Sequence, residues 1–84
     1  MRTEHAPDDE KRIDRLQSLS TEWLGRGAAV GIDRTPEGYR IAVYDLWGAE
    51  RLAVTREDKR SALGASIRSV QKRIRGSEDA EGSR

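Results

Sequence analysis

The sequence predicts an α+β fold, a small two-layer sandwich in the order helix, three-stranded antiparallel sheet, helix (α-β-β-β-α). Apolar residues recur at helical spacing near both ends of the chain, and they alternate with polar residues in the middle. Turn-forming residues separate the alternating segments. A chain of 84 residues has room for one domain, and 37% charged against 35% apolar residues implies a thin core.

The first helix is predicted from its acidic start and its apolar stripe. Three carboxylates suit the positive end of a helix, and they are Asp8, Asp9 and Glu10. The stripe continues from there at steps of three and four: Ile13, Leu16, Leu19 (or Ser20), Trp23 and Leu24. We expect Gly25 and Gly27 to end this helix, and we assign residues 1–8, which show no periodicity, to a disordered lead-in.

A period of two then predicts three strands. The first alternates over residues 28–33, the second over residues 39–44 and the third over residues 51–55. Between the first two, Pro36 presets the backbone for a turn and Gly38 accepts a positive φ. A second reversal is expected over residues 46–49, so the strands form an antiparallel meander.

The second helix is expected after the third strand. Thr55 and Asp58 have the spacing of a capping box, which places the start of the helix there. Its buried stripe is Leu63, Ile67, Val70 and Ile74. We expect Gly76 to cap its C-terminal end, with Arg73 and Arg75 near the negative end of the helix dipole. The domain is thus assigned to residues 9–76, and residues 77–84 to a disordered tail without apolar side chains.

Composition and patterning narrow the class of protein. The longest uncharged apolar run, residues 28–32, is far shorter than the roughly 18–20 residues of a membrane-spanning helix. Acidic residues stand where a signal peptide would be apolar. Without cysteine there are no disulfides, and we expect a cytoplasmic protein. Thirteen arginines against three lysines, with no Phe, Cys or Asn, are typical of DNA rich in G and C, as in some bacteria and their phages.

No catalytic, cofactor or metal constellation is found in the sequence. The single histidine, His5, has no second histidine or cysteine to complete a zinc site and no nucleophile to activate. The glycines at 25, 27 and 31 have the spacing GxGxxxG and come after a helix, whereas a dinucleotide fingerprint comes after a strand. We therefore expect a protein without enzymatic activity and without a cofactor.

One stretch resembles the opening hairpin of RNase H-like folds. Val30, Gly31, Ile32 and Asp33 are followed by Ala42, Val43, Tyr44 and Asp45. The resemblance implies a metal-binding role for Asp33. A two-metal site needs further carboxylates from later strands, and this chain has one more helix in which to supply them. The alternative is a hairpin in which Asp33 only precedes a turn.

A second resemblance, to double-stranded-RNA-binding domains, rests on the order of elements. Lys59, Arg60, Ser61 and Ala62 are similar to the start of that family's KKxAK motif, which implies contacts to phosphates from the start of the last helix. The chain departs from the motif at Leu63, lacks the loop histidine, and has Glu57 and Asp58 beside the basic pair. These two acids are expected to weaken the local attraction for phosphates.

The remaining candidates are exposed side chains that could bind a partner. Arg68, Lys72 and Arg75 form a cationic stripe opposite the apolar stripe of the last helix. Trp47 lies at the predicted tip of the second hairpin, and Tyr44 lies on the strand face opposite Ile41. Aromatic residues outside a core are favoured interface anchors, although a hairpin tip can also fold a tryptophan back onto a helix.

We therefore expect a small protein-binding module, an adaptor or inhibitor such as a phage or bacterial accessory protein, that occupies a partner's surface. Its partner-binding residues are Tyr44, Trp47, Arg68, Lys72 and Arg75. The alternative is a nucleic-acid-binding module that uses Lys59, Arg60, Arg68, Lys72 and Arg75. No membrane partner is expected, and a core this small also suits stabilisation as a homodimer.

Overall fold

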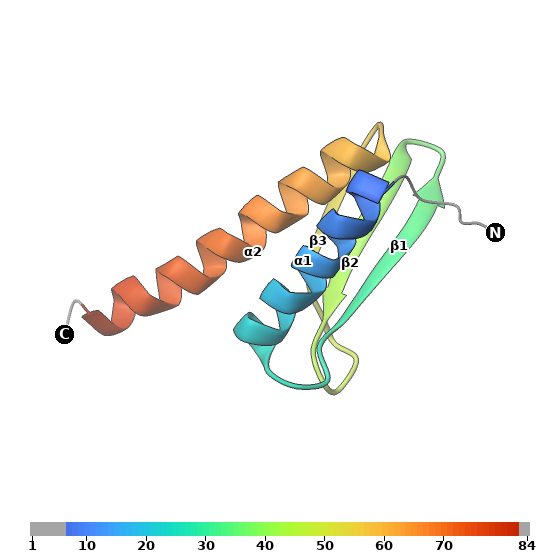
Figure 1. The fold of residues 1–84 in the computed structure, drawn as a ribbon. Helices are drawn as coiled ribbons and strands as arrows, with labels where there is room; N and C mark the ends of the chain where they lie inside the picture. The colour runs from blue at the N-terminus through green and yellow to red at the C-terminus, as the bar shows by residue number, and fades with distance from the viewer. Residues whose placement is uncertain (1–6, 83–84) are drawn as a thin grey trace.

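The computed structural model describes the backbone of residues 7–82 and the side chains of residues 8–76. Its elements are α1 (Pro7–Leu24), β1 (Ala29–Thr35), β2 (Gly38–Tyr44), β3 (Glu50–Arg56) and α2 (Lys59–Gly82), as Figure 1 shows. The predicted α-β-β-β-α order is confirmed. His5 and most of the predicted lead-in lie outside the described residues.

Helix α1 begins at Pro7, within the predicted lead-in. Proline suits the first helical turn because an N–H group there would have no partner within the helix, so nothing is lost by its absence. The φ of proline is also already helical. The three predicted acids occupy this first turn. At the other end, the Gly25 N–H donates to the Thr21 carbonyl at 2.7 Å, so the helix ends where the glycine signal placed it.

The three strands form one antiparallel sheet in the order β1-β2-β3. Thr35 pairs with Gly38, which leaves Pro36 and Glu37 as a tight turn between β1 and β2. Gly38 has φ +135, the positive value predicted for this position. Between β2 and β3 the register shifts at Val43 and Tyr44, as expected for a bulge beside a hairpin loop.

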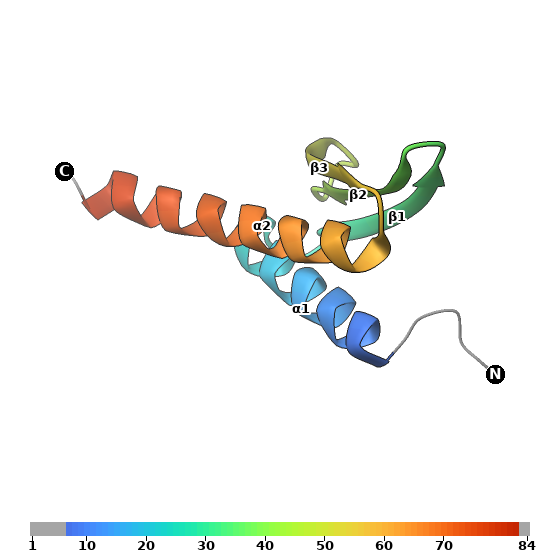
Figure 2. The same cartoon turned by 90° about the horizontal axis from the view of Figure 1, so that it is seen from above.

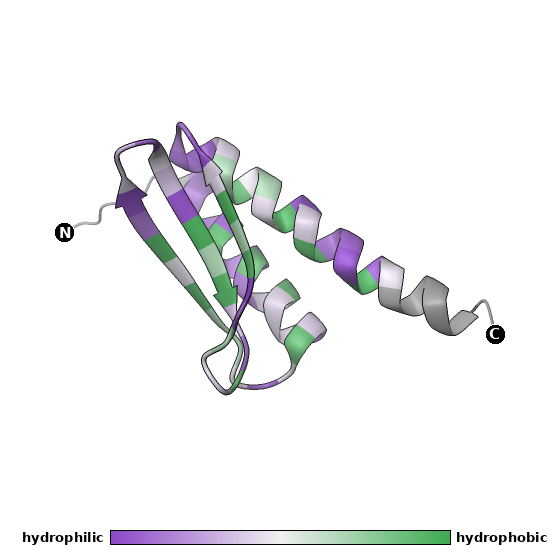
Figure 3. Cartoon of the chain, turned by 180° about the vertical axis from the view of Figure 1, so that it is seen from behind, coloured by the Kyte–Doolittle hydropathy of each residue, from purple (hydrophilic) through white to green (hydrophobic). Residues whose placement is uncertain are grey.

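Both helices lie on the same face of the sheet, as Figure 2 shows, so the molecule has the two predicted layers. The core lies between these layers, and its fully or nearly buried residues are Leu16, Ile41, Val43, Leu52, Ala62, Leu63, Ile67 and Val70. Every apolar residue of the two predicted helix stripes belongs to this core or packs against it. Figure 3 shows apolar residues in the middle of the strands and polar residues at the ends near the β1–β2 turn.

The contact between the two helices is made in part by small residues. Ser20 on α1, the alternative to Leu19 in the predicted stripe, and Ser66 on α2 are both completely buried. The Ser66 hydroxyl donates to the Ala62 carbonyl one turn earlier at 2.8 Å, so its burial leaves no unpaired donor. Short side chains let two helices approach closely, which is why serine is accepted at these positions.

The start of α2 differs from the predicted capping box. Asp58 is the N-cap, and its carboxylate accepts hydrogen bonds from the Ser61 N–H at 2.9 Å and from the Ser61 hydroxyl at 2.8 Å. These bonds, the backbone one first, hold the pKa of Asp58 below its usual value. Thr55 cannot cap the helix because it pairs with Arg40 inside the sheet.

The predicted end of α2 at Gly76 is also wrong. The helix runs on to Gly82, and Gly76 is not among the described residues with a positive φ. The helix therefore projects beyond α1 and the sheet, as Figure 1 shows, and the molecule measures 49 × 23 × 23 Å. Arg73, expected near the helix end, instead lies 5.6 Å from the Trp23 ring. Within the described residues, neither helix has the length and hydropathy needed to cross a membrane.

Gly76→Ala is expected to increase helix content and to stabilise α2 by about 0.5–1 kcal/mol, because alanine is the better helix former. An added Cβ at this position has no neighbouring atom within 4 Å. Far-UV circular dichroism during thermal unfolding measures the effect. A loss of helix content would instead indicate that Gly76 ends the helix in a left-handed conformation.

Candidate functional site

The β2–β3 hairpin loop is held in place by one side chain, Asp45. Its Oδ1 accepts hydrogen bonds from the Trp47 and Ala49 N–H groups, both at 3.0 Å. Its carbonyl accepts from the Gly48 N–H at 2.9 Å, and its Oδ2 accepts from Arg51 at 3.3 Å. The bonds from Ala49, Trp47 and Arg51 hold the pKa of Asp45 below its usual value. The loop therefore has a defined shape that does not depend on the Trp47 side chain.

Leu46 and Trp47 form the end of this loop, and we call them the apolar tip. Their exposed fractions are 60% and 84%. Leu46 leans on the α1–β1 connection, because a Cβ on Gly27 would lie 2.6 Å from its Cδ1. The sequence allowed Trp47 to be either exposed or folded onto a helix, and the structure places it in solvent. Leu46 was not singled out from the sequence, since a leucine in a turn gives no signal of exposure.

Tyr44 lies beside the apolar tip, on the sheet face away from the helices. It is half-buried over Gly31, where an added Cβ would lie 3.3 Å from the tyrosine ring. On the same face, Arg40 bonds to Glu50 at 2.6 Å. This bond raises the pKa of Arg40, and a hydrogen bond with Tyr44 adds to the shift. Ala42, which lies between Arg40 and Tyr44 on β2, is only 1% exposed.

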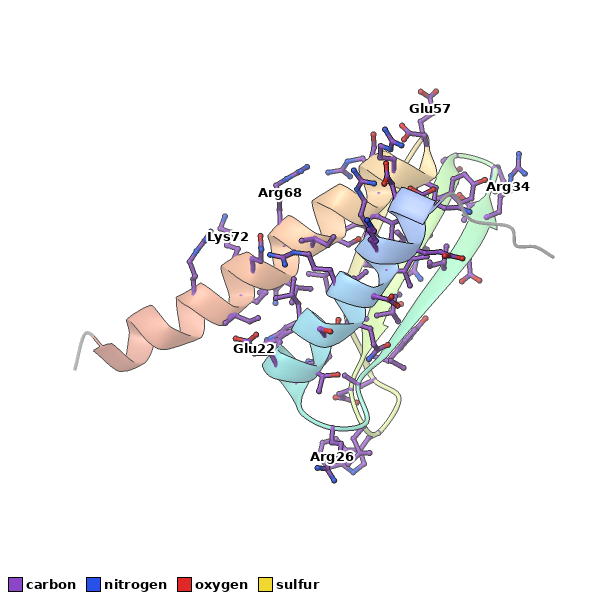
Figure 4. The ribbon with its side chains drawn as sticks, in the orientation of Figure 1. Glu22, Arg26, Arg34, Glu57, Arg68 and Lys72 are labelled. Carbon is purple, nitrogen blue, oxygen red and sulfur yellow. The ribbon has the colours of Figure 1, made fainter. Side chains whose placement is uncertain are left out.

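The cationic stripe is exposed as predicted. Arg68, Lys72 and Arg75 are all exposed, and Figure 4 shows Arg68 and Lys72 projecting from α2 into solvent. The stripe lies on α2, whereas the β2–β3 loop lies at the end of the sheet near Arg26. The five predicted partner-binding residues therefore belong to two surfaces, one formed by Tyr44 and the apolar tip and the other by the stripe.

The side chains of Lys59 and Arg60, the basic pair at the start of α2, lie in different surroundings. The Lys59 ammonium lies 5.5 Å from the centre of the Tyr39 ring, at the start of the central strand β2. Arg60 instead lines a cleft of about 460 Å³, together with Arg12, Arg56, Ser61, Gly64 and Arg68. Sequence reasoning missed Arg12 and Arg56 because they lie on other elements, and no spacing along the chain relates them to α2.

Within the described residues, Asp33 does not belong to a group of side chains that could hold a metal ion. Asp33 is exposed on β1 and pairs in register with Arg40. Across the part of the chain that the structure describes, no three His, Cys, Asp or Glu side chains are grouped so that they could hold a metal ion. The carboxylates that a two-metal site needs are therefore not assembled around Asp33 in this part of the chain.

The order of elements shared with double-stranded-RNA-binding domains is present in the structure. No family model matches the chain, however, and no curated protein or solved structure matches it either. Order of elements alone carries no function, since one fold supports many activities.

Proposed function

We propose that the chain is a small, non-enzymatic protein-binding module whose anchor is the apolar tip. The observation that carries the proposal is the 84% exposed side chain of Trp47 on a loop fixed by Asp45. Exposed tryptophan is costly in water and is the residue type most enriched in binding hot spots. Because the loop is already ordered, little conformational entropy is lost when the tip enters a partner.

The surroundings of the tip suit a protein surface. Tyr44 adds a half-buried aromatic neighbour, and Arg26 is an exposed cation at the same end of the domain. Arg51, also exposed, is bonded to Asp45 of the loop. An apolar centre with a polar rim is the usual anatomy of a protein interface. The partner would offer an apolar pocket for Trp47, with acidic or polar groups around it.

Such a module acts by occupying its partner's surface, as an adaptor or an inhibitor does. A cytoplasmic partner fits the cysteine-free sequence, and a phage or bacterial accessory protein fits its arginine-rich composition. The stripe on α2 favours a second candidate, nucleic-acid binding, because Arg68, Lys72 and Arg75 are exposed there. Affinity capture from the source cell, with and without nuclease, separates a protein partner from a nucleic-acid one.

Trp47→Ala is expected to weaken binding of the captured partner by about 30-fold or more, equivalent to about 2 kcal/mol, with little change in the unfolding midpoint. The side chain is exposed and the loop is held by Asp45, so the fold does not need it. Calorimetric titration of the partner and a denaturant melt measure the two effects.

Trp23→Ala is the matched control. Trp23 packs against the core, and its ring lies between Arg51 and Arg73 at 5.8 and 5.6 Å. Its removal should therefore lower stability. If Trp47→Ala unfolds as readily as Trp23→Ala, the tip is structural and the proposal fails. If the wild-type chain sediments as a dimer and Trp47→Ala as a monomer, the partner is a second copy.

A further inference from the structure

Four arginines from three elements converge on one cleft. Arg12 comes from α1, Arg56 from the end of β3, and Arg60 and Arg68 from α2. The cleft has a volume of about 460 Å³ and is completed by Ser61 and Gly64. It lies at the end of β3 opposite to the apolar tip, so a role for this cleft is independent of partner binding by the tip.

Gly64 makes room for the cleft. It lies four residues from both Arg60 and Arg68 on the same face of α2, so it leaves a gap between them. An added Cβ would lie 3.4 Å from Arg68 Nη1, which shows that the Arg68 side chain folds back over the glycine. Gly64 therefore contributes no side chain to the cleft, and the Arg68 guanidinium group lies over it.

The acids expected to weaken this basic region do not line the cleft. Asp58 is engaged with Ser61 as the N-cap of α2. Glu57 projects away from the domain at the β3–α2 turn, as Figure 4 shows. Glu57 therefore points away from the cleft, whereas the Asp58 carboxylate lies beside it, bonded to the cleft residue Ser61.

The arginines are only loosely neutralised. Arg60 is 4.0 Å from Asp8, with both side chains more than half exposed, and Arg12 is 3.9 Å from Asp9. The exposed Arg60–Asp8 pair contributes little at such a distance. Arg56 donates to the neighbouring Thr55 carbonyl at 2.8 Å, and Arg68 has no ion pair or hydrogen bond within the described residues. Four like charges are thus gathered, and two of them, on Arg12 and Arg60, have a carboxylate partner at 3.9 and 4.0 Å.

We propose that this arginine cleft binds linked phosphate groups. Guanidinium forks match phosphate oxygens in a bidentate way, and four positive charges in one cleft suit a ligand with more negative charge than a single phosphate carries. No aromatic or aliphatic side chain lines the cleft, so a ligand is held there by charge and hydrogen bonds and not by apolar contact. The phosphates can come from a free polyphosphate or from a nucleic-acid backbone, which Lys72 and Arg75 would follow along α2.

Titration of pyrophosphate, and of a labelled DNA duplex at several salt concentrations, tests the proposal on the full chain. Arg60→Gln/Arg68→Gln should weaken pyrophosphate binding at least tenfold, and both side chains are exposed, so the fold should persist by circular dichroism. Arg68→Gln alone is compared with Arg26→Gln, which removes the same charge at the other end of the domain. Only Arg68→Gln should weaken binding by more than about threefold.

The double variant Lys72→Gln/Arg75→Gln distinguishes the two sources of phosphate, a nucleic-acid backbone and a free polyphosphate. A nucleic-acid backbone is indicated if this variant weakens duplex binding and lowers its salt slope but leaves pyrophosphate unaffected. A free polyphosphate is indicated if pyrophosphate binds and the duplex does not. The proposal is overturned if pyrophosphate binds no better than sulfate at equal ionic strength and the duplex does not bind. It is also overturned if Arg68→Gln and Arg26→Gln weaken binding equally.

Discussion

Replacing Gly38 with alanine is expected to destabilise the domain by about 3 kcal/mol or more, which would unfold a large fraction of a protein this small. Gly38 has φ +135, a conformation that costs other residues about 1–3 kcal/mol. Its Cα also lies against the end of β3. An added Cβ would overlap the Arg56 carbonyl oxygen and would lie 2.7 Å from Glu57 Cα. Backbone atoms cannot move aside without breaking the β2–β3 pairing, which adds a further cost of about 1–3 kcal/mol.

Gly48→Ala is the control, measured by the same urea unfolding curves. Gly48 also has a positive φ, +82, but an added Cβ there has no neighbour within 4 Å. It should therefore cost only about 1 kcal/mol, the strain of a left-handed backbone in alanine. Equal losses in the two variants would contradict the close packing of β3 on Gly38.

Gly38 also illustrates what the sequence could predict. The turn and its positive φ followed from Pro36 and Gly38 themselves, because turn chemistry is local. The contact with Arg56 could not be predicted in the same way, because it depends on how β3 lies beside β2. The strands and helix stripes were predictable because burial on one face leaves a period that can be read directly from the chain.

Two predictions for α2 were wrong, the cap at its start and its end at Gly76, because each followed from a local sequence preference that does not decide the structure there. Thr55 is a good cap, but its place in β3 is held by pairing with Arg40, so Asp58 caps the helix. Gly76 is a common helix terminator, but a glycine costs a helix only about 1 kcal/mol, which does not require it to stop. Local propensity thus identified the elements and misplaced their boundaries.

The candidate surfaces were predictable only in part. Helical spacing placed Arg68, Lys72 and Arg75 on one exposed stripe. The exposure of Trp47 depended on how a loop is held, and Asp45 holds it through bonds that no spacing rule anticipates. The cleft was hidden altogether, because Arg12 and Arg56 meet α2 only after the helices and the sheet have packed together.

Ile41→Ala is expected to destabilise the domain by about 2–5 kcal/mol, as large-to-small changes at fully buried positions do. Ile41 is completely buried at the middle of the central strand, and its register partners are Ile32 on β1 and Val54 on β3. Neither helix can collapse onto the lost volume without leaving the other strands, so a cavity remains in a core with few other large residues. Ile67→Ala, on the facing stripe of α2, should lose stability for the same reason.

Ile32→Ala removes the same atoms from the residue that pairs with Ile41, but on an edge strand where the side chain is only half-buried. Water can fill the space there, so the loss should be clearly smaller than for Ile41→Ala. Urea unfolding of the three variants under one buffer gives the comparison. If Ile41→Ala and Ile67→Ala keep a near-unchanged cooperative transition, the two helices do not cover this face of the sheet. If Ile32→Ala loses as much stability as Ile41→Ala, the edge strand is covered by something other than α1 and α2. A second copy of the chain is then the first candidate for that cover.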